Sequence, residues 1–300
     1  MTDAVSVAPV SVVIPTVGRP DLLRDALLSL SRCEPRAAEV LVVDQSDENL
    51  SDPVIADVGL PGARTVRSRA GGRGLAVNLG LKNAGQPVVL VVDDDCTVRA
   101  DWVGAASRAM EEEPEGIVCG RVLPPPGADP RLVPSTMLLE TPRDYTGQTI
   151  SGALFAGNMA CSRDAVLAIG GFDEDIVPSA EDCEFCYRWL RAGGRLRHIP
   201  DLVVWHQAWR TPEQLERLYV DYYRGLGIFY AKHLAARDLT VLRFLAGDFY
   251  AALLSLARRQ NGAARWEDAR RGAFTGLPRG LRDGWRRFRP SRRADRLTGP

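Results

Sequence analysis

The chain has 300 residues, of which 45% are hydrophobic and 25% charged, a composition typical of a globular protein with one large core or two small ones. Its formal net charge is zero, but from Arg258 to the C-terminus 13 arginines face 4 acidic residues, so this segment carries +9 and the rest −9. The composition therefore argues against a disordered chain. The excess of basic charge lies in the C-terminal tail.

The N-terminus lacks the basic start and sustained apolar region of an export signal, and the six cysteines form no evident disulfide framework. The most apolar C-terminal stretch, residues 238–256, is interrupted by Arg243 and Asp248. No window approaches the roughly 20 apolar residues that span a bilayer. We therefore expect a cytoplasmic protein that does not cross a membrane.

Three short runs rich in β-branched residues predict buried strands, and they are residues 11–15, 40–44 and 88–92. Apolar residues at helical spacing predict helices over residues 21–30 and at about 74–83 and 102–112. The order strand, helix, strand predicts an α/β fold with an open parallel sheet.

A proline-rich stretch at residues 123–134 predicts a loop between this first half and a second half that contains residues 157–193. From Pro212 onward the apolar pattern becomes helical. We expect an α/β domain over residues 1–210 and a helical extension with a basic tail over residues 211–300.

Each predicted strand ends in polar residues, and the most polar end is the triplet Asp93, Asp94 and Asp95. Ligands of open α/β sheets bind beyond the carboxyl ends of the strands. Three adjacent carboxylates repel one another, and a divalent cation would offset that repulsion. Asp93 and Asp95 are expected on the same side of an extended chain, where they suit a diphosphate with Mg²⁺ or Mn²⁺. A solvated acidic turn or a helix cap is the alternative interpretation.

Five segments between residues 10 and 206 resemble, in order and spacing, the family 2 glycosyltransferases of the GT-A fold. They are SVVIPTVGRPDLLRDALLSL, EVLVVDQSD, RAGGRGLAVNLGLKNAGQPVVLVVDDD, GNMACSRDAVLAIGGFDED and EDCEFCYRWLRAG. The resemblance implies a Rossmann-like, mostly parallel sheet flanked by helices. It also implies a transferase that moves a sugar from a nucleotide-sugar to an acceptor hydroxyl.

The resemblance assigns roles to individual residues of the donor site. Thr16 and Asp44 would line the nucleotide, and a base N–H donated to Asp44 would favour UDP- or dTDP-sugars. Asp93 would hold the ribose and contribute to the metal site, Asp95 would bind the metal as part of the DxD motif, and Arg73 would lie near the diphosphate. The remaining donor-site residues implied by the resemblance are Pro15, Arg19, Ser46, Asn78 and Asp94.

Asp182 matches the base of the family, which accepts the proton of the acceptor hydroxyl during an inverting displacement. Its neighbour Glu181 would hold or tune it, although an acidic pair at a helix start is also a common cap. His206 ends the apolar run DLVVWH and matches a position that completes metal coordination in many members of the family. Packing against aromatic neighbours is the alternative for His206. Cys96, beside the aspartates, is expected to be a small packing residue.

Leu218 stands where the processive synthases of the family have the tryptophan of QxxRW, so we expect one sugar per encounter. The acceptor would be a carbohydrate or a lipid-linked intermediate of cell-surface polysaccharide or glycolipid synthesis. The C-terminal helices could cover the acceptor site or form a homodimer surface.

The basic tail could contact anionic lipids at the inner face of the cell membrane, and a solvated tail is the alternative. No recognisable nucleic-acid-binding fold accompanies its charge, so nucleic acid is not an expected partner. The tail combines aromatic and basic residues, namely Trp285, Arg286, Arg287, Phe288, Arg289, Arg292 and Arg293.

Two other functions share parts of this pattern. A sugar-nucleotide nucleotidyltransferase has a similar sheet and metal-binding aspartates, but it usually carries a glycine-rich basic loop where this chain has PTVGRPD. A non-catalytic nucleotide-sugar-binding module would bind the donor and would tolerate the loss of Asp182.

Overall fold

The computed structural model describes residues 6–146, 152–257 and 272–289 of the chain. The chain forms two compact units. The first comprises Met1–Glu174 with Glu181–Ala208 and contains the sheet, whereas the second comprises Asp175–Ala180 with Trp209–Pro300 and is helical.

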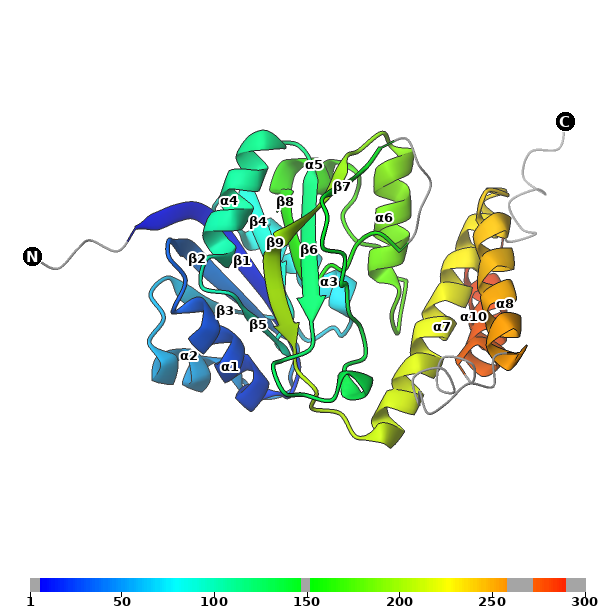
Figure 1. The fold of residues 1–300 in the computed structure, drawn as a ribbon, viewed down its shortest axis with the longest axis horizontal. Helices are drawn as coiled ribbons and strands as arrows, with labels where there is room; N and C mark the ends of the chain where they lie inside the picture. The colour runs from blue at the N-terminus through cyan, green and yellow to red at the C-terminus, as the bar shows by residue number, and fades with distance from the viewer. Residues whose placement is uncertain (1–5, 147–151, 258–271, 290–300) are drawn as a thin grey trace, which may run out of the picture. The chain divides into compact units, whose positions relative to one another are not determined.

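The sheet of the first unit has nine strands among the described residues, in the order β3-β2-β1-β4-β8-β6-β9-β5, with β7 paired to β9 (Figure 1). The strands are β1 Val7–Thr16, β2 Arg36–Asp44, β3 Ala63–Arg67, β4 Val88–Val92, β5 Cys96–Val98, β6 Ile117–Leu123, β7 Arg143–Tyr145, β8 Asn158–Ser162 and β9 Leu196–His206.

Strands β3, β2, β1 and β4 are parallel, which confirms the parallel sheet predicted for the N-terminal half. The other half is mixed, because β8 runs antiparallel to both β4 and β6 while β6 and β9 are parallel. β5 is antiparallel to β9 and so joins the end of the first half to the last strand.

Helices cover both faces of this sheet (Figure 1). They are α1 Pro20–Leu30, α2 Ser51–Val58, α3 Arg73–Asn83, α4 Trp102–Glu112, α5 Arg163–Ala168 and α6 Glu181–Arg191. Val12 and Ile14 of β1 pack in the core under α1, α2 and α4, whereas Val13 packs in the core under α3, α5 and α6. A strand buried on both faces needs apolar residues at every position, which explains the uninterrupted runs of the sequence.

The helices of the second unit are α7 Pro212–Ala235, α8 Val241–Ala257 and α10 Leu277–Phe288, with a π-helical turn η2 at Gly272–Gly276. The side chain of Thr211 and that of Gln214 form a reciprocal capping box at the start of α7. α10 packs so closely on α7 that a side chain would not fit at Gly280. A β-carbon there would lie 2.8 Å from the carbonyl carbon of Arg224 and nearer still to its oxygen. The predicted helical C-terminal region is thus confirmed.

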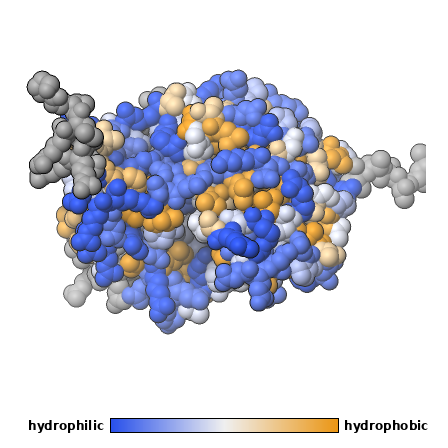
Figure 2. Space-filling model, turned by 180° about the vertical axis from the view of Figure 1, so that it is seen from behind, coloured by the Kyte–Doolittle hydropathy of each residue, from blue (hydrophilic) through white to orange (hydrophobic). Residues whose placement is uncertain are grey.

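In the tail, Trp285 is 50% exposed, and Arg286, Arg287 and Arg289 are also exposed. Arg292 and Arg293 lie outside the described residues. On the face that Figure 2 shows, hydrophobic patches alternate with hydrophilic residues. Among the helices described, none combines the length and the apolar character needed to cross a membrane.

Candidate active site

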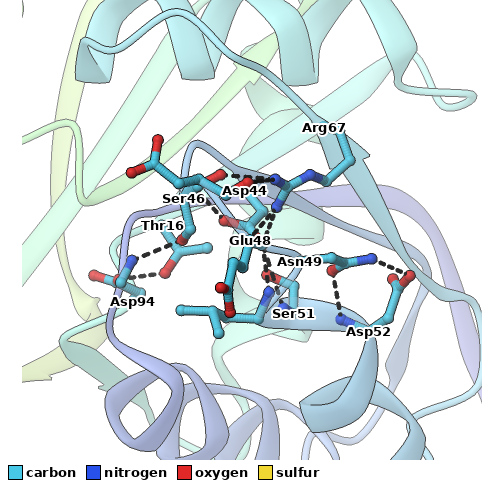
Figure 3. A network of polar contacts seen from close by, with 12 residues as sticks. Thr16, Asp44, Ser46, Glu48, Asn49, Ser51, Asp52, Arg67 and Asp94 are labelled. Carbon is cyan, nitrogen blue, oxygen red and sulfur yellow. Dashed lines mark hydrogen bonds and ion pairs between the residues drawn. The ribbon is translucent and has the colours of Figure 1, made fainter.

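Asp94 connects the end of β1 to the turn after β4. Its Oδ2 accepts a hydrogen bond of 2.6 Å from the Thr16 hydroxyl (Figure 3). Its Oδ1 pairs with the Arg19 guanidinium at 2.7 Å. The residue is fully buried. Burial raises the pKa of Asp94 to about 7, although the Arg19 charge acts in the opposite direction. The side chain expected at the donor therefore lies enclosed beneath the turn.

Asp44 is the centre of a second polar network, at the end of β2 (Figure 3). Its Oδ1 accepts from the backbone N–H of Ser46 at 2.8 Å. Its Oδ2 accepts from Arg67 at 2.6 Å, from the N–H of Leu50 at 3.2 Å and from that of Ser51 at 3.3 Å. Burial alone would raise its pKa, but the hydrogen bonds from Ser46 and Ser51 and the charge of Arg67 hold the pKa below its usual range. Asp44 is thus an ionised, fully buried anchor of the loop that follows β2.

Two other predicted residues, Ser46 and Pro15, lie near the ends of β2 and β1. The Ser46 hydroxyl accepts a 2.8 Å hydrogen bond from the N–H of Gly18, which ties the loop after β2 to the loop after β1. Pro15 pairs with Val43 in the parallel register of β1 and β2. The loops after these two strands are therefore held side by side.

Arg73 connects the donor and acceptor halves of the expected site. Its Nε and Nη2 lie 2.8 and 2.7 Å from Oδ1 of Asp93, and its Nη1 lies 3.1 Å from Oε1 of Glu181. Arg73 begins α3, Asp93 follows β4 and Glu181 begins α6. Side chains far apart in the sequence therefore meet in one partly buried cluster, in which Arg73 is 25% exposed and Asp93 19%.

Asp182 follows Glu181 and lies next to this cluster. Its Oδ1 accepts a 2.8 Å hydrogen bond from the backbone N–H of Cys183. Burial raises the pKa of Glu181 to about 7 and also raises that of Asp182, while the charge of Arg73 lowers both. A carboxylate with a pKa raised toward neutrality is suited to accept a proton from a hydroxyl.

Asn78 holds the loop before α6. Its amide nitrogen donates to the carbonyl of Phe172 at 2.8 Å and to Oε1 of Glu174 at 2.9 Å, and its Oδ1 accepts from the N–H of Phe172 at 2.8 Å. Gly171, in this loop, has φ +66° and no room for a β-carbon beside Asn78. The buried amide is thus engaged by the loop on the acceptor side, which differs from the donor contact expected for it.

The turn after β4 separates the first and third aspartates. β4 ends at Val92 and residues 94 and 95 form a turn, so the expectation of an extended chain with Asp93 and Asp95 on one side is wrong. Asp93 pairs with Arg73, whereas Oδ1 of Asp95 lies 3.5 Å from Nε2 of His206.

Asp95, Cys96 and His206 form a candidate metal site. One ligand atom from each lies within 4.8 Å of the other two, and all three residues are buried. Nδ1 of His206 lies 3.1 Å from the carbonyl oxygen of Ser135, so a proton on Nδ1 leaves the lone pair of Nε2 toward Asp95. A carboxylate and an imidazole oriented in this way fit a divalent transition-metal ion such as Mn²⁺.

Two residues in these clusters, Cys96 and Arg67, were not assigned to the site from the sequence. Arg67 gave no motif signal, and its contact with Asp44 depends on the pairing of β2 with β3. Cys96 directly follows the aspartates, but only the pairing of β5 with β9 places it opposite His206.

Comparison with known proteins gives a family and a fold. Residues 11–170 match the model described as Glycosyl transferase family 2. The "Pre-mycofactocin glycosyltransferase" of Mycobacterium tuberculosis, strains CDC 1551 / Oshkosh and ATCC 25618 / H37Rv, is 28% identical over 207 residues, 66% of this chain and 42% of the relative. The chain therefore spans about two fifths of the length of these curated relatives.

Two solved structures are similar over nearly the whole chain. S. aureus TarS 1–349 in complex with UDP-GlcNAc is 18% identical with a TM-score of 0.54, over 94% of this chain and 93% of TarS. The mannosyltransferase PcManGT from Pyrobaculum calidifontis in complex with GDP-Man and Mn²⁺ is 17% identical with a TM-score of 0.54, over 100% of this chain and 80% of PcManGT. At these identities the likeness shows the fold alone, and it confirms the predicted GT-A fold.

Proposed function

This chain belongs to glycosyl transferase family 2, and we propose that it is an inverting, metal-dependent and non-processive enzyme that transfers a hexose from a nucleotide-sugar to an acceptor hydroxyl. The observation that carries the proposal is the position of Arg73 between Asp93 of the donor side and Glu181 of the acceptor side. This arrangement supports a site in which donor and acceptor meet.

We propose UDP- or dTDP-sugars as donors. Asp44 is ionised and can only accept hydrogen bonds, which suits the N–H of a uracil or thymine ring. The similar structures contain UDP-GlcNAc in TarS and GDP-Man in PcManGT, so the base is the part of this proposal that most needs measurement.

Three of the residues expected at the donor have supporting contacts, and we assign them to positioning. Asp94 and Arg19 fix the turn that presents Asp93 and Asp95. Asn78 fixes the loop on the acceptor side. Direct contacts with the donor are assigned to Thr16, Asp93 and the backbone at Pro15.

We propose that Asp95 and His206 hold a Mg²⁺ or Mn²⁺ ion, with Asp93 nearby at the ribose. Such an ion, when bound, neutralises negative charge on the departing nucleoside diphosphate. The side chains of Asp95 and His206 are each about 5% exposed, so few water molecules reach their ligand atoms.

Asp182 is proposed as the base. Its carboxylate takes the proton of the acceptor hydroxyl while the acceptor oxygen bonds to the anomeric carbon and the bond from that carbon to the diphosphate oxygen breaks. Glu181 pairs with Arg73 and so positions this cation between the two substrates. No covalent enzyme intermediate is required.

We further propose that residues 1–210 form the catalytic domain and residues 211–300 an extension. The acceptor would be a carbohydrate or lipid-linked intermediate of cell-surface polysaccharide or glycolipid synthesis. The exposed tryptophan and arginines of α10 support peripheral contact with the inner face of the membrane. The protein would then work from the cytoplasmic side.

Isothermal titration with UDP and dTDP, in Mn²⁺ or in EDTA, tests the donor site, with GDP, CMP and ADP as controls. Metal-dependent binding that disappears in Asp95→Ala supports the proposal. Binding of none of these nucleotides overturns it. Release of pyrophosphate in place of nucleoside diphosphate would indicate a nucleotidyltransferase, and unimpaired function of Asp182→Asn would indicate a binding module.

A further inference from the structure

We propose that Cys96 is a third protein ligand of the metal site, so that the site binds thiophilic ions such as Zn²⁺ or Co²⁺ through one oxygen, one sulfur and one nitrogen. The inference rests on the proposed metal site at Asp95 and His206 and adds a ligand that neither the sequence motif nor the resemblance assigns.

The pairing of β5 with β9 is the first observation. Cys96 lies directly opposite His206 in this antiparallel pair. Side chains of directly opposed residues point to the same face of a sheet, with β-carbons about 5 Å apart. Because Asp95 immediately precedes β5, its carboxylate is brought to the same place.

Distances within the cluster agree with direct coordination. Two ligands of a tetrahedral ion, with bonds of about 2.0 to 2.3 Å, lie roughly 3.3 to 3.5 Å apart. Nε2 of His206 and Oδ1 of Asp95 are already 3.5 Å apart, and the Cys96 sulfur lies within 4.8 Å of a ring nitrogen of His206 and of a carboxylate oxygen of Asp95. Coordination by Cys96 requires its sulfur to approach the other two ligand atoms to about 3.5 Å.

The contact between His206 and the Ser135 carbonyl is a second, independent observation. It directs the lone pair of Nε2 into the cluster before any ion binds. Three protein ligands with a further position for a ligand oxygen is the usual composition of catalytic zinc sites. In this chain the further position would be taken by the donor diphosphate.

The sulfur makes the site selective. Mg²⁺ and Mn²⁺ prefer oxygen and would leave the thiol as a packing group, whereas Zn²⁺ and Co²⁺ gain a thiolate ligand. On binding of such an ion the S–H bond breaks, an S–metal bond forms and the proton leaves to solvent. We therefore expect Zn²⁺ and Co²⁺ to bind without nucleotide and to displace Mn²⁺.

Titration of the nucleotide-free protein with Co²⁺ tests this inference by absorption spectroscopy. The expected result is a near-ultraviolet thiolate-to-cobalt charge-transfer band together with visible d–d bands. In Cys96→Ser the charge-transfer band should disappear. The affinity for Co²⁺ should fall roughly tenfold or more, because loss of even a residue that only hydrogen-bonds to a metal ligand lowers metal affinity by about this factor. Cys33→Ser, which alters another buried cysteine, is the matched control and should keep the band.

The outcomes separate this inference from the proposed function. If the wild type shows no charge-transfer band but still binds UDP with Mn²⁺, Cys96 is only a packing residue and the inference is overturned. If Cys96→Ser loses the band and keeps Mn²⁺-dependent UDP binding, both the third ligand and the donor site are supported. Failure of both metals to bind the folded wild type would overturn the metal site itself.

Discussion

Gly157 offers a way to displace the carboxylate of Asp93 without removing it. Gly157 directly precedes β8, whose first residue Asn158 pairs with Val92 at the end of β4. A β-carbon added at Gly157 would lie 2.8 Å from Cγ of Asp93 and nearer still to its Oδ2, and it would also meet Cε1 of Phe155 at 2.5 Å. Carbon atoms that are not bonded pack at about 3.5 Å or more, so Gly157→Ala should move the Asp93 carboxylate by about 0.7 Å.

A displacement of this size directed away from Arg73 breaks its contacts with Asp93. The nitrogens of Arg73 lie 2.7 and 2.8 Å from Oδ1 of Asp93, and an added 0.7 Å takes these distances beyond the about 3.2 Å limit of a good hydrogen bond. A hydrogen bond to a charged group contributes about 1.5 to 3 kcal/mol. Because Asp93 is partly exposed and can rotate, we take the lower value for the proposed ribose contact, which corresponds to about tenfold weaker UDP binding.

Isothermal titration with UDP and Mn²⁺ measures this effect, and thermal unfolding shows that the variant is folded. Gly71→Ala is the matched control, because a β-carbon at Gly71 meets no atom within 4 Å and the affinity should not change. UDP affinity equal to that of the wild type in Gly157→Ala would refute the reasoning, since a displaced Asp93 could not then be a ribose ligand.

Three further predictions follow from the same contacts. Asp182→Asn should reduce sugar transfer by about 10²-fold or more while UDP binding stays within about twofold, because only the base is lost; transfer and titration assays check this. The kcat/KM of the wild type should rise with pH along a limb that lies above the usual range of an aspartate, because burial raises the pKa of Asp182 and the base must lose its proton, and Glu181→Gln should move this limb to lower pH by removing a negative neighbour; a pH profile of both enzymes measures it. Gly280→Ala should lower the free energy of unfolding by about 2 kcal/mol through overpacking against α7, whereas Gly247→Ala, in open space on α8, should raise it by up to about 1 kcal/mol, as denaturant titration will show.

The strands and helices of the N-terminal half could be predicted because their signals are local. Residues 88–92 and 102–112 have the bounds that hydrophobic periodicity indicates, and β1 and β2 extend the predicted runs toward their N-termini. The short strands β3 and β5 carry no comparable apolar run and were not predicted. Their residues are strands because they pair with β2 and β9.

The sequence indicates candidate site residues but not the partners that hold their side chains. Position at a strand end indicates that Asp94 is near the site, but it does not show that Thr16 and Arg19 enclose the carboxylate. The partners of Asn78 were equally unpredictable, since they lie more than 90 residues away along the chain. Such contacts depend on how helices and loops pack and leave no periodic signal in the sequence.

The double ion pair of Arg73 has a consequence for how the two proposed substrates affect each other's binding. One guanidinium balances two carboxylates, Asp93 and Glu181, on opposite halves of the site. A donor that engages Asp93 and brings negative phosphates changes the share of the Arg73 charge left for Glu181, and with it the proton affinity beside Asp182. Because such coupling is reciprocal, an acceptor should in turn alter donor affinity. Initial-rate kinetics should therefore show that the concentration of one substrate changes the KM of the other.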